Sequence, residues 1–250
     1  MRRPAKYAML SQGRNIMQEQ NIRLNKWIAE TGYSSRREAD KLIEAGRVTI
    51  DGRKGVLGDQ VSPGASVRVD GIELRPVRRR IYIALHKPLG IVCTADPREP
   101  GNVVDFVGHG ERLFPIGRLD KDSTGLLLMT NDGDIVNPIL RAANGHEKEY
   151  IVTVDKPITP EFIEKMCAGM EILGQTTLPC RITPEGPRRF RLILTQGLNR
   201  QIRRMCEAHS YNVTELKRVR IMNVHLGRLL PGHWRNLTDA EIRGLIGEDD

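Results

Sequence analysis

The chain has 250 residues, with 39 lysines and arginines against 31 aspartates and glutamates, a net charge of +8. Apolar residues make up 39%, enough for a packed core, and no apolar run approaches the roughly 18 residues of a membrane-spanning helix. The four cysteines are scattered without a C-x-x-C pair, which argues against a zinc site or a disulfide framework. We therefore expect free thiols and a cytoplasmic protein.

The excess positive charge belongs to the N-terminal third of the chain. Residues 1–80 hold 17 basic and 9 acidic side chains, whereas residues 81–250 hold 22 of each. This asymmetry favours a polyanionic partner, most simply nucleic acid, although a solvated basic face would give the same count. Residues 1–21 have no hydrophobic signal core and no acid before Glu19. We expect a basic, disordered tail there rather than an organellar transit peptide.

Residues 22–74 are predicted to form a compact unit of two helices followed by short strands. The stretch "IRLNKWIAETG" places apolar residues at i, i+3 and i+4, the pattern of one helical face. The stretch "SSRREADKLIEAG" opens with Ser35 and Glu38 at the spacing of a capping box and stops at Gly46. Asp51-Gly52 is typical of a hairpin turn between the strands that follow.

A second unit is predicted over residues 81–240, after the charged linker "RPVRRR" at 75–80. Its strands read "IYIAL", "LLLMT", "EYIVTV" and "RRFRLILTQG", and its helices read "TPEFIEKMCAG" and "NRQIRRMCEAHS". Strands dominate without regular alternation with helices, which favours an α+β fold over a doubly wound α/β fold. Residues 241–250 are expected to form an acidic tail.

The stretch "GRLDKDSTGLLLMTNDGD", residues 117–134, carries a charged turn directly before an apolar strand. This position places Asp120 at the mouth of a cleft, where a carboxylate can serve as a nucleophile, a general base or a structural cap. A half-buried carboxylate needs a cation to stay ionised. The candidates are Arg118 and the arginines of "NRQIRRM".

Several cofactor and metal motifs are absent from the sequence. Neither the P-loop nor the glycine-rich dinucleotide fingerprint occurs. The stretch "HEKEY" at 146–150 nearly matches the zincin helix motif, but Tyr150 stands where the second imidazole ligand would be, so we reject zinc there. The sequence predicts no cofactor and no metal.

Three stretches resemble motifs of ribosomal RNA pseudouridine synthases of the RsuA group: "GRLDKDSTGLLLMTNDGD", "HEKEYIVTV" and "GLNRQIRRM", in the family's order. The stretch at 22–52 is similar to the RNA-binding domain first described in ribosomal protein S-four. The likeness is greatest to the large-subunit members of the RluF and RluB type. It implies a small helix-helix-strand domain, then a larger domain with a mainly antiparallel mixed sheet and flanking helices around a cleft.

The resemblance also implies roles for individual residues. Asp120 matches the catalytic aspartate, Tyr150 matches the tyrosine that stacks on the target base, and Arg203 matches the basic partner of the aspartate. The implied substrate-binding residues are Arg118, in the gap left by a flipped nucleotide, Ile202, lining the uracil pocket, and Arg200. The basic side chains around the second helix and first hairpin are the expected RNA contacts: Arg36, Arg37, Lys41, Arg47, Arg53 and Lys54.

The implied activity is cofactor-free isomerisation of a uridine in ribosomal RNA, most simply in the large subunit. The RNA partner would be a structured stem-loop or a pre-ribosomal particle, and we expect a monomer. Arg203 and Arg118 could alternatively be plain phosphate contacts, and Tyr150 a core aromatic. Three other functions stay open: a non-catalytic ribosome-assembly factor, a small-subunit pseudouridine synthase and an RNA methyltransferase. The lack of a glycine-rich cofactor loop counts against the methyltransferase.

Overall fold

The computed structural model describes residues 21–76, 79–96, 98–140 and 145–247. Of the predicted basic tail 1–21, residues 1–20 lie outside these ranges. The chain forms two compact units, which divide between Ile81 and Tyr82, except that Gly110–Arg112 belong to the first unit. Each unit has its own hydrophobic core, as the sequence predicts for two separate domains.

The N-terminal unit packs two helices against short strands. Its elements are β1 (Ile22–Arg23), α1 (Leu24–Glu30), α2 (Arg36–Glu44), β2 (Val48–Ile50), β3 (Arg53–Lys54), β4 (Gln60–Val61), β5 (Val67–Val69) and β6 (Ile72–Glu73). The predicted capping box is present, because Glu38 N donates to Ser35 Oγ at 3.2 Å and Ser35 N donates to Glu38 Oε2 at 2.8 Å. The turn from β2 to β3 has positive φ at Asp51 and Gly52, as a type I′ hairpin requires.

The strands of this unit form two small antiparallel sheets. The larger sheet has the order β3-β2-β5-β6, and β1 pairs with β4. Their inward-facing residues meet the apolar face of the helices: Leu24, Trp27 and Ile28 of α1 pack with Ile43 of α2 and with Val48 of β2.

The C-terminal unit is built on one large mixed sheet. Its strands are β7 (Tyr82–Lys87), β8 (Phe114–Ile116), β9 (Thr124–Thr130), β10 (Lys148–Val154), β13 (Arg181–Gly186), β14 (Arg189–Leu194), β15 (Val213–Ile221), β16 (Val224–His225) and β17 (Trp234–Asn236). The order is β13-β14-β10-β15-β9-β7-β17, with β16 beside β15 and β8 beside β9. Strands β9 and β15 run parallel, and the other neighbouring strands run antiparallel.

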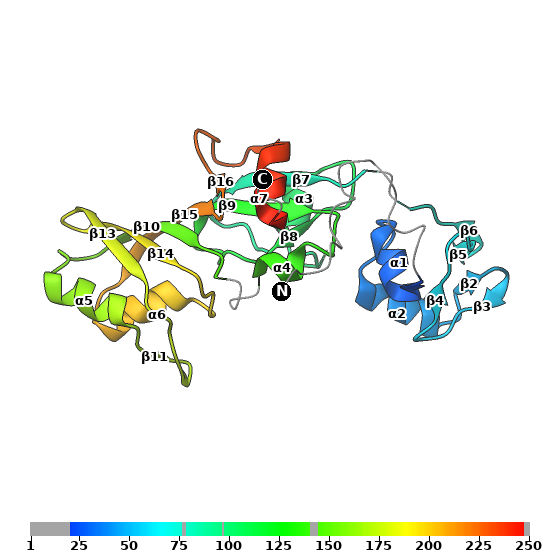
Figure 1. Cartoon of the computed structure of the whole chain (residues 1–250), viewed down its shortest axis with the longest axis horizontal. Helices are drawn as coiled ribbons and strands as arrows, with labels where there is room; N and C mark the ends of the chain where they lie inside the picture. Colours follow the sequence, from blue (N-terminus) through cyan, green and yellow to red (C-terminus); the bar gives the residue numbers. More distant parts are fainter. Residues whose placement is uncertain (1–20, 77–78, 97, 141–144, 248–250) are drawn as a thin grey trace, which may run out of the picture. The chain divides into compact units, whose positions relative to one another are not determined.

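Short helices cover the two halves of this sheet (Figure 1). They are α3 (Val103–Val107), α4 (Val136–Leu140), α5 (Pro160–Ala168), α6 (Gln201–Ala208) and α7 (Asp239–Ile246), and a separate hairpin joins β11 (Glu171–Ile172) to β12 (Gln175–Thr176). Helices α5 and α6 lie beside the β13-β14-β10 half, and α4 and α7 beside the β9-β7 half. The α+β fold with a mainly antiparallel mixed sheet is thereby confirmed.

The C-terminal end differs from the expected acidic tail over 241–250. Helix α7 runs to Ile246, and Leu245 is buried in the core with Leu237 and Ile139. A capping box of Thr238 and Glu241 starts this helix. The acidic composition of this segment gives no sign of the helix. Because α7 packs on the core, the folded unit extends beyond residue 240.

Candidate active site

The turn that carries Asp120 is fixed by hydrogen bonds from β7 and from the loop that follows β7. Lys87 Nζ donates to Ser123 O at 2.8 Å, and Gly90 N donates to Lys121 O at 2.9 Å. Lys87 is fully buried, and burial lowers the pKa of its amine. A buried lysine with backbone carbonyls as its hydrogen-bond partners fixes the turn in one position.

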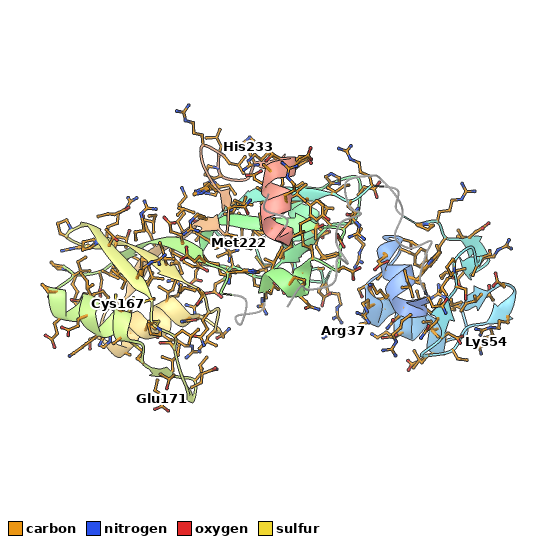
Figure 2. The ribbon with its side chains drawn as sticks, in the orientation of Figure 1. Arg37, Lys54, Cys167, Glu171, Met222 and His233 are labelled. Carbon is orange, nitrogen blue, oxygen red and sulfur yellow. The ribbon has the colours of Figure 1, made fainter. Side chains whose placement is uncertain are left out.

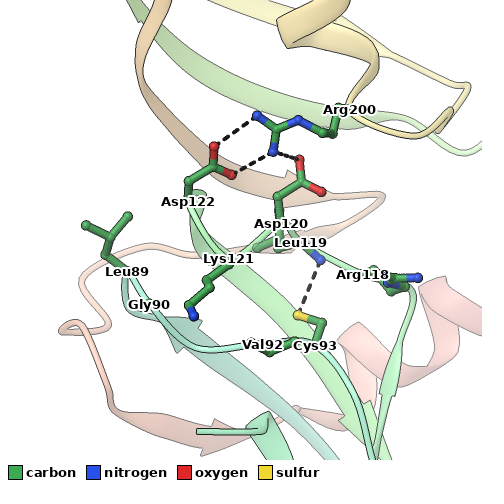
Figure 3. A pocket seen from close by; sticks show the side chains of 10 residues that line it. All are labelled: Leu89, Gly90, Val92, Cys93, Arg118, Leu119, Asp120, Lys121, Asp122 and Arg200. Atoms are coloured by element: carbon green, nitrogen blue, oxygen red, sulfur yellow. Dashed lines mark hydrogen bonds and ion pairs between the residues drawn. The ribbon is translucent and has the colours of Figure 1, made fainter. Parts of the chain in front are cut away.

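Arg200 joins the two carboxylates of this turn (Figure 3). Its Nη1 lies 3.7 Å from Asp120 Oδ2, and its guanidinium donates two hydrogen bonds of 3.1 Å to Asp122. These bonds lower the pKa of Asp122 and raise that of Arg200. Arg200 has a φ of +50° at the N-cap of α6, a strained conformation for a non-glycine residue. This strained residue is the one that links the start of α6 to the turn that carries Asp120 and Asp122.

Arg203 occupies a different place from the one predicted for it. The expected pairing was with Asp120, but the structure pairs Arg203 Nε with Asp122 Oδ2 at 3.3 Å. Its other donors are held by two backbone carbonyls, Asp122 O at 2.8 Å and Val213 O at 3.0 Å. The side chain is 8% exposed. Because these carbonyls anchor the guanidinium, the cation beside Asp120 is Arg200.

A cleft of about 670 Å³ opens beside the turn and brings most of the predicted site residues together. Its walls include Asp120, Arg118, Arg200, Tyr150 and Ile202, whereas Arg203 does not line it. The Asp120 side chain is 31% exposed, so it is open to a ligand, and Tyr150 is 9% exposed on β10. One carboxylate, one aromatic ring, the exposed Arg118 and the partly exposed Arg200 therefore line a shared space.

Two further cations line this cleft that sequence reasoning missed, Lys148 and Arg218. Both are buried. Lys148 Nζ donates to two backbone carbonyls, and burial lowers its pKa, with the charge of Arg218 lowering it further. The alternation of β10 puts Lys148 on the same face as Tyr150, a signal present in "KEY". Nothing in "LKRVRI" shows which of its cations faces the cleft.

The close packing of Arg218 beside the strand that follows the Asp120 turn depends on a glycine. Gly125 begins the buried part of β9 with a φ of +105°, directly beside Arg218 on the parallel strand β15. A Cβ atom added at Gly125 would lie 2.2 Å from Arg218 O, closer than any real contact. Only glycine lets the two strands come together here.

The six predicted RNA contacts of the N-terminal unit are all exposed. Arg47 pairs with Asp70, and Arg53 pairs with Asp59. Within the described residues, no ion pair engages the other four: Arg36, Arg37, Lys41 and Lys54. Figure 2 shows the side chains of this unit, with Arg37 and Lys54 labelled. The charge on α2 is thus available to a polyanion.

Known proteins resemble both units. Residues 81–208 match the RNA pseudouridylate synthase family, and residues 22–71 match the S4 domain. The chain is 56% identical to the dual-specificity RNA pseudouridine synthase RluF of Escherichia coli K12, over 92% of this chain and 80% of that protein. The chain belongs to the RNA pseudouridine synthase family. It is also 34% identical to ribosomal large subunit pseudouridine synthase B of Salmonella typhi, over 90% of this chain and 83% of that one.

A solved structure supports the same assignment. The crystal structure of a pseudouridylate synthase superposes with a TM-score of 0.67 at 30% identity, covering 90% of this chain and 99% of that chain. The predicted resemblance and the order of an S4 domain before a synthase domain are confirmed. As an RNA pseudouridine synthase, the chain is an isomerase. Among the described residues, no helix is long and apolar enough to cross a membrane.

Proposed function

We propose that this enzyme converts a uridine of large-subunit ribosomal RNA to pseudouridine in the cytoplasm. The observation that carries the proposal is the convergence of Asp120, Tyr150 and Arg200 on one cleft. The relatives named for ribosomal RNA support the substrate class. The reaction is an isomerisation: the C1′–N1 bond breaks, a C1′–C5 bond forms, and the C5 proton is lost while N1 gains one. It requires no net oxidant or reductant.

The cleft geometry suits a base that has left its helix. A uridine inside a duplex cannot reach a buried cleft, so it must flip out, at a cost of about a few kcal/mol. Stacking on the Tyr150 ring offsets part of that cost. Ile202 offers an apolar wall, and Arg118 and Arg200 lie where the exposed edge of the cleft would meet backbone phosphates.

Asp120 is the group proposed to act on the nucleotide. Its carboxylate can attack the sugar, add to the base or abstract a ribose proton, and the three routes share one position beside the flipped base. Arg200 balances its charge from the cleft edge. Arg203 is proposed to act through Asp122, which shares Arg200 with Asp120. It is therefore a positioning residue.

The S4 unit is proposed to dock the enzyme on a structured RNA. Its exposed cations would neutralise phosphates and release counterions. Relatives at 56% identity are named dual-specificity enzymes, so we infer that this chain also modifies a second RNA. We propose that the enzyme works as a monomer.

The test is a map of pseudouridines in all stable RNAs from cells with and without the gene. The proposal predicts loss of at least one pseudouridine in large-subunit ribosomal RNA, restored by the wild-type gene. A pseudouridine lost only from small-subunit ribosomal RNA would show that the substrate is the small-subunit RNA. An unchanged map would favour the alternative function, an RNA-binding assembly factor.

A further inference from the structure

Arg218 is a buried cation whose surroundings do not explain its charge. It lies on β15 directly opposite Tyr150 on β10, and its side chain lines the cleft. Its Nε donates to Leu126 O at 2.7 Å and its Nη1 to Arg118 O at 3.3 Å. Nη2 is buried and has no hydrogen-bond partner in the part of the chain that the structure describes.

Such an arrangement is costly in a folded protein. Buried polar groups are almost always hydrogen-bonded, and a buried charge normally has a counterion. Arg218 is 4% exposed, and no carboxylate of the described residues forms an ion pair with it. A second buried cation, Lys148, lines the same cleft with its Nζ bonded to two carbonyls. Two like charges facing one cleft favour a ligand that carries or develops negative charge.

The position of Arg218 in the cleft indicates which part of a bound nucleotide it would contact. The exposed Arg118 and the partly exposed Arg200 also line the cleft, and solvent-accessible cations are the ones that can reach the backbone phosphates of a flipped nucleotide. Arg218 instead lies beside Tyr150, on which the base is proposed to stack. A uracil stacked on Tyr150 would present its carbonyl oxygens as the acceptors for a buried donor there.

Negative charge reaches those oxygens in each chemical route. When the C1′–N1 bond breaks with its electron pair left on the ring, the uracil anion spreads its charge over N1, O2 and O4. When a carboxylate adds to C6 instead, the electrons of the C5–C6 bond move to O4. Donors held in a water-poor site stabilise such charge at little reorganisation cost.

We propose that Arg218, with Lys148 beside it, forms an oxyanion site for the uracil ring. Nη2 donates to a uracil carbonyl oxygen, and this hydrogen bond strengthens as the ring becomes negative. The inference rests on the proposed function, and it assigns Arg218 as a catalytic residue. The bonds from Arg218 to the Leu126 and Arg118 carbonyls hold the guanidinium in place for this contact.

The test compares wild-type enzyme with Arg218→Lys and with the control Lys217→Met. Lys217 neighbours Arg218 on β15, faces the other side of the sheet by strand alternation and does not line the cleft. Large-subunit ribosomal RNA is transcribed with uridine, 2-thiouridine or 4-thiouridine, because sulfur is a weak acceptor. Liquid chromatography with mass spectrometry of the nucleosides gives kcat and KM for each transcript.

The proposal predicts that Arg218→Lys lowers kcat on the order of 100-fold, the usual effect of losing one oxyanion donor, with KM for RNA nearly unchanged. Wild-type and Lys217→Met enzymes should be slowed by one of the two thio substitutions. That slowing should disappear in Arg218→Lys. Lys148→Met, which leaves the Arg218 bonds in place, should also lower kcat and gives a second arm if Arg218→Lys folds poorly.

Two results would overturn the inference while leaving the proposed function intact. A thio effect as large in Arg218→Lys as in the wild type would mean that Arg218 does not touch a uracil oxygen. A rise in KM with unchanged kcat and a weaker salt dependence would make Arg218 a phosphate contact. Failure of the wild-type enzyme to form pseudouridine in the unmodified transcript would overturn both proposals.

Discussion

Arg200 Nη1 lies 3.7 Å from Asp120 Oδ2, and this ion pair joins the loop before α6 to the turn before β9. The same guanidinium holds Asp122 through two hydrogen bonds. Asp122 Oδ2 in turn forms an ion pair with Nε of the buried Arg203, at 3.3 Å. The position of Asp120 therefore depends on a chain of charges that starts inside the core and ends at the cleft edge.

Arg200→Ala should slow turnover far more than it changes stability. The side chain is 38% exposed, so its ion pairs should contribute at most about 1 kcal/mol to folding. Without Arg200, a displacement of the Asp120 carboxylate by about 1 Å can lower the reaction rate on the order of 100-fold. Tritium release from RNA labelled at uridine C5 measures the rate. The control is Arg188→Ala, an exposed arginine that does not line the cleft and should keep wild-type turnover. Equal rates for all three proteins would exclude Arg200 from the site.

Arg203→Ala should lower both stability and activity. It removes a buried guanidinium that pairs with the half-exposed Asp122, and it leaves two backbone carbonyls without this donor. Leaving a buried acceptor unsatisfied typically costs about 1–3 kcal/mol. Arg203→Lys should recover part of the loss, because the charge stays while the planar fork is gone. Urea denaturation gives the free energy of unfolding. An alanine variant as stable as the wild type would show that these bonds contribute nothing to the fold.

Asp122→Asn should change how stability depends on pH. The pKa of Asp122 is lowered in the folded state, chiefly by hydrogen bonds from Arg200. Its contribution to stability is therefore present above the ordinary pKa of 3.8 and is lost as pH falls through the lower folded value. The variant should be less stable than the wild type at neutral pH, and the difference should shrink below about pH 4. Unfolding free energies that differ equally at all pH values would contradict this linkage.

Replacing Arg36, Arg37 and Lys41 together by alanine should weaken RNA binding and its salt dependence. All three are exposed on α2 without an ion pair among the described residues. Each lost phosphate contact lowers the slope of log affinity against log salt by about 0.7–0.9, so the slope should fall by about 2–3. The matched control exchanges lysine and arginine at the same positions and keeps every charge. The measurement is titration of one RNA with each protein at several salt concentrations. Equal slopes for the alanine variant and the wild type would mean that α2 does not contact RNA.

Local patterns in the sequence predict much of this fold. The capping box of Ser35 and Glu38, the Asp51-Gly52 turn and the apolar run Leu126–Met129 each act within a few residues, and each is found where expected. The resemblance of three ordered motifs also predicts that Asp120 and Tyr150 share a cleft. These features need only short-range information or known motifs.

Long-range pairing is what the sequence leaves open. Arg200 and Arg203 stand three residues apart in one basic motif, and only the packing of α6 decides which of them meets Asp120. Arg218 faces the cleft because β15 pairs with β9 and β10 in a particular register. Helix α7 is missed because four of the ten residues 241–250 are acidic, whereas the burial of Leu245 depends on tertiary packing. Each case depends on tertiary contacts that local patterns do not encode.

The variant Asp120→Asn tests whether Asp120 performs the chemistry. The change is nearly isosteric and removes one negative charge from a partly exposed side chain, so the protein should fold and bind RNA as before. Pseudouridine formation in large-subunit ribosomal RNA, followed by tritium release under single-turnover conditions, is the measurement. The account predicts no detectable product from Asp120→Asn beside full conversion by the wild type. Product formed at the wild-type rate would contradict it.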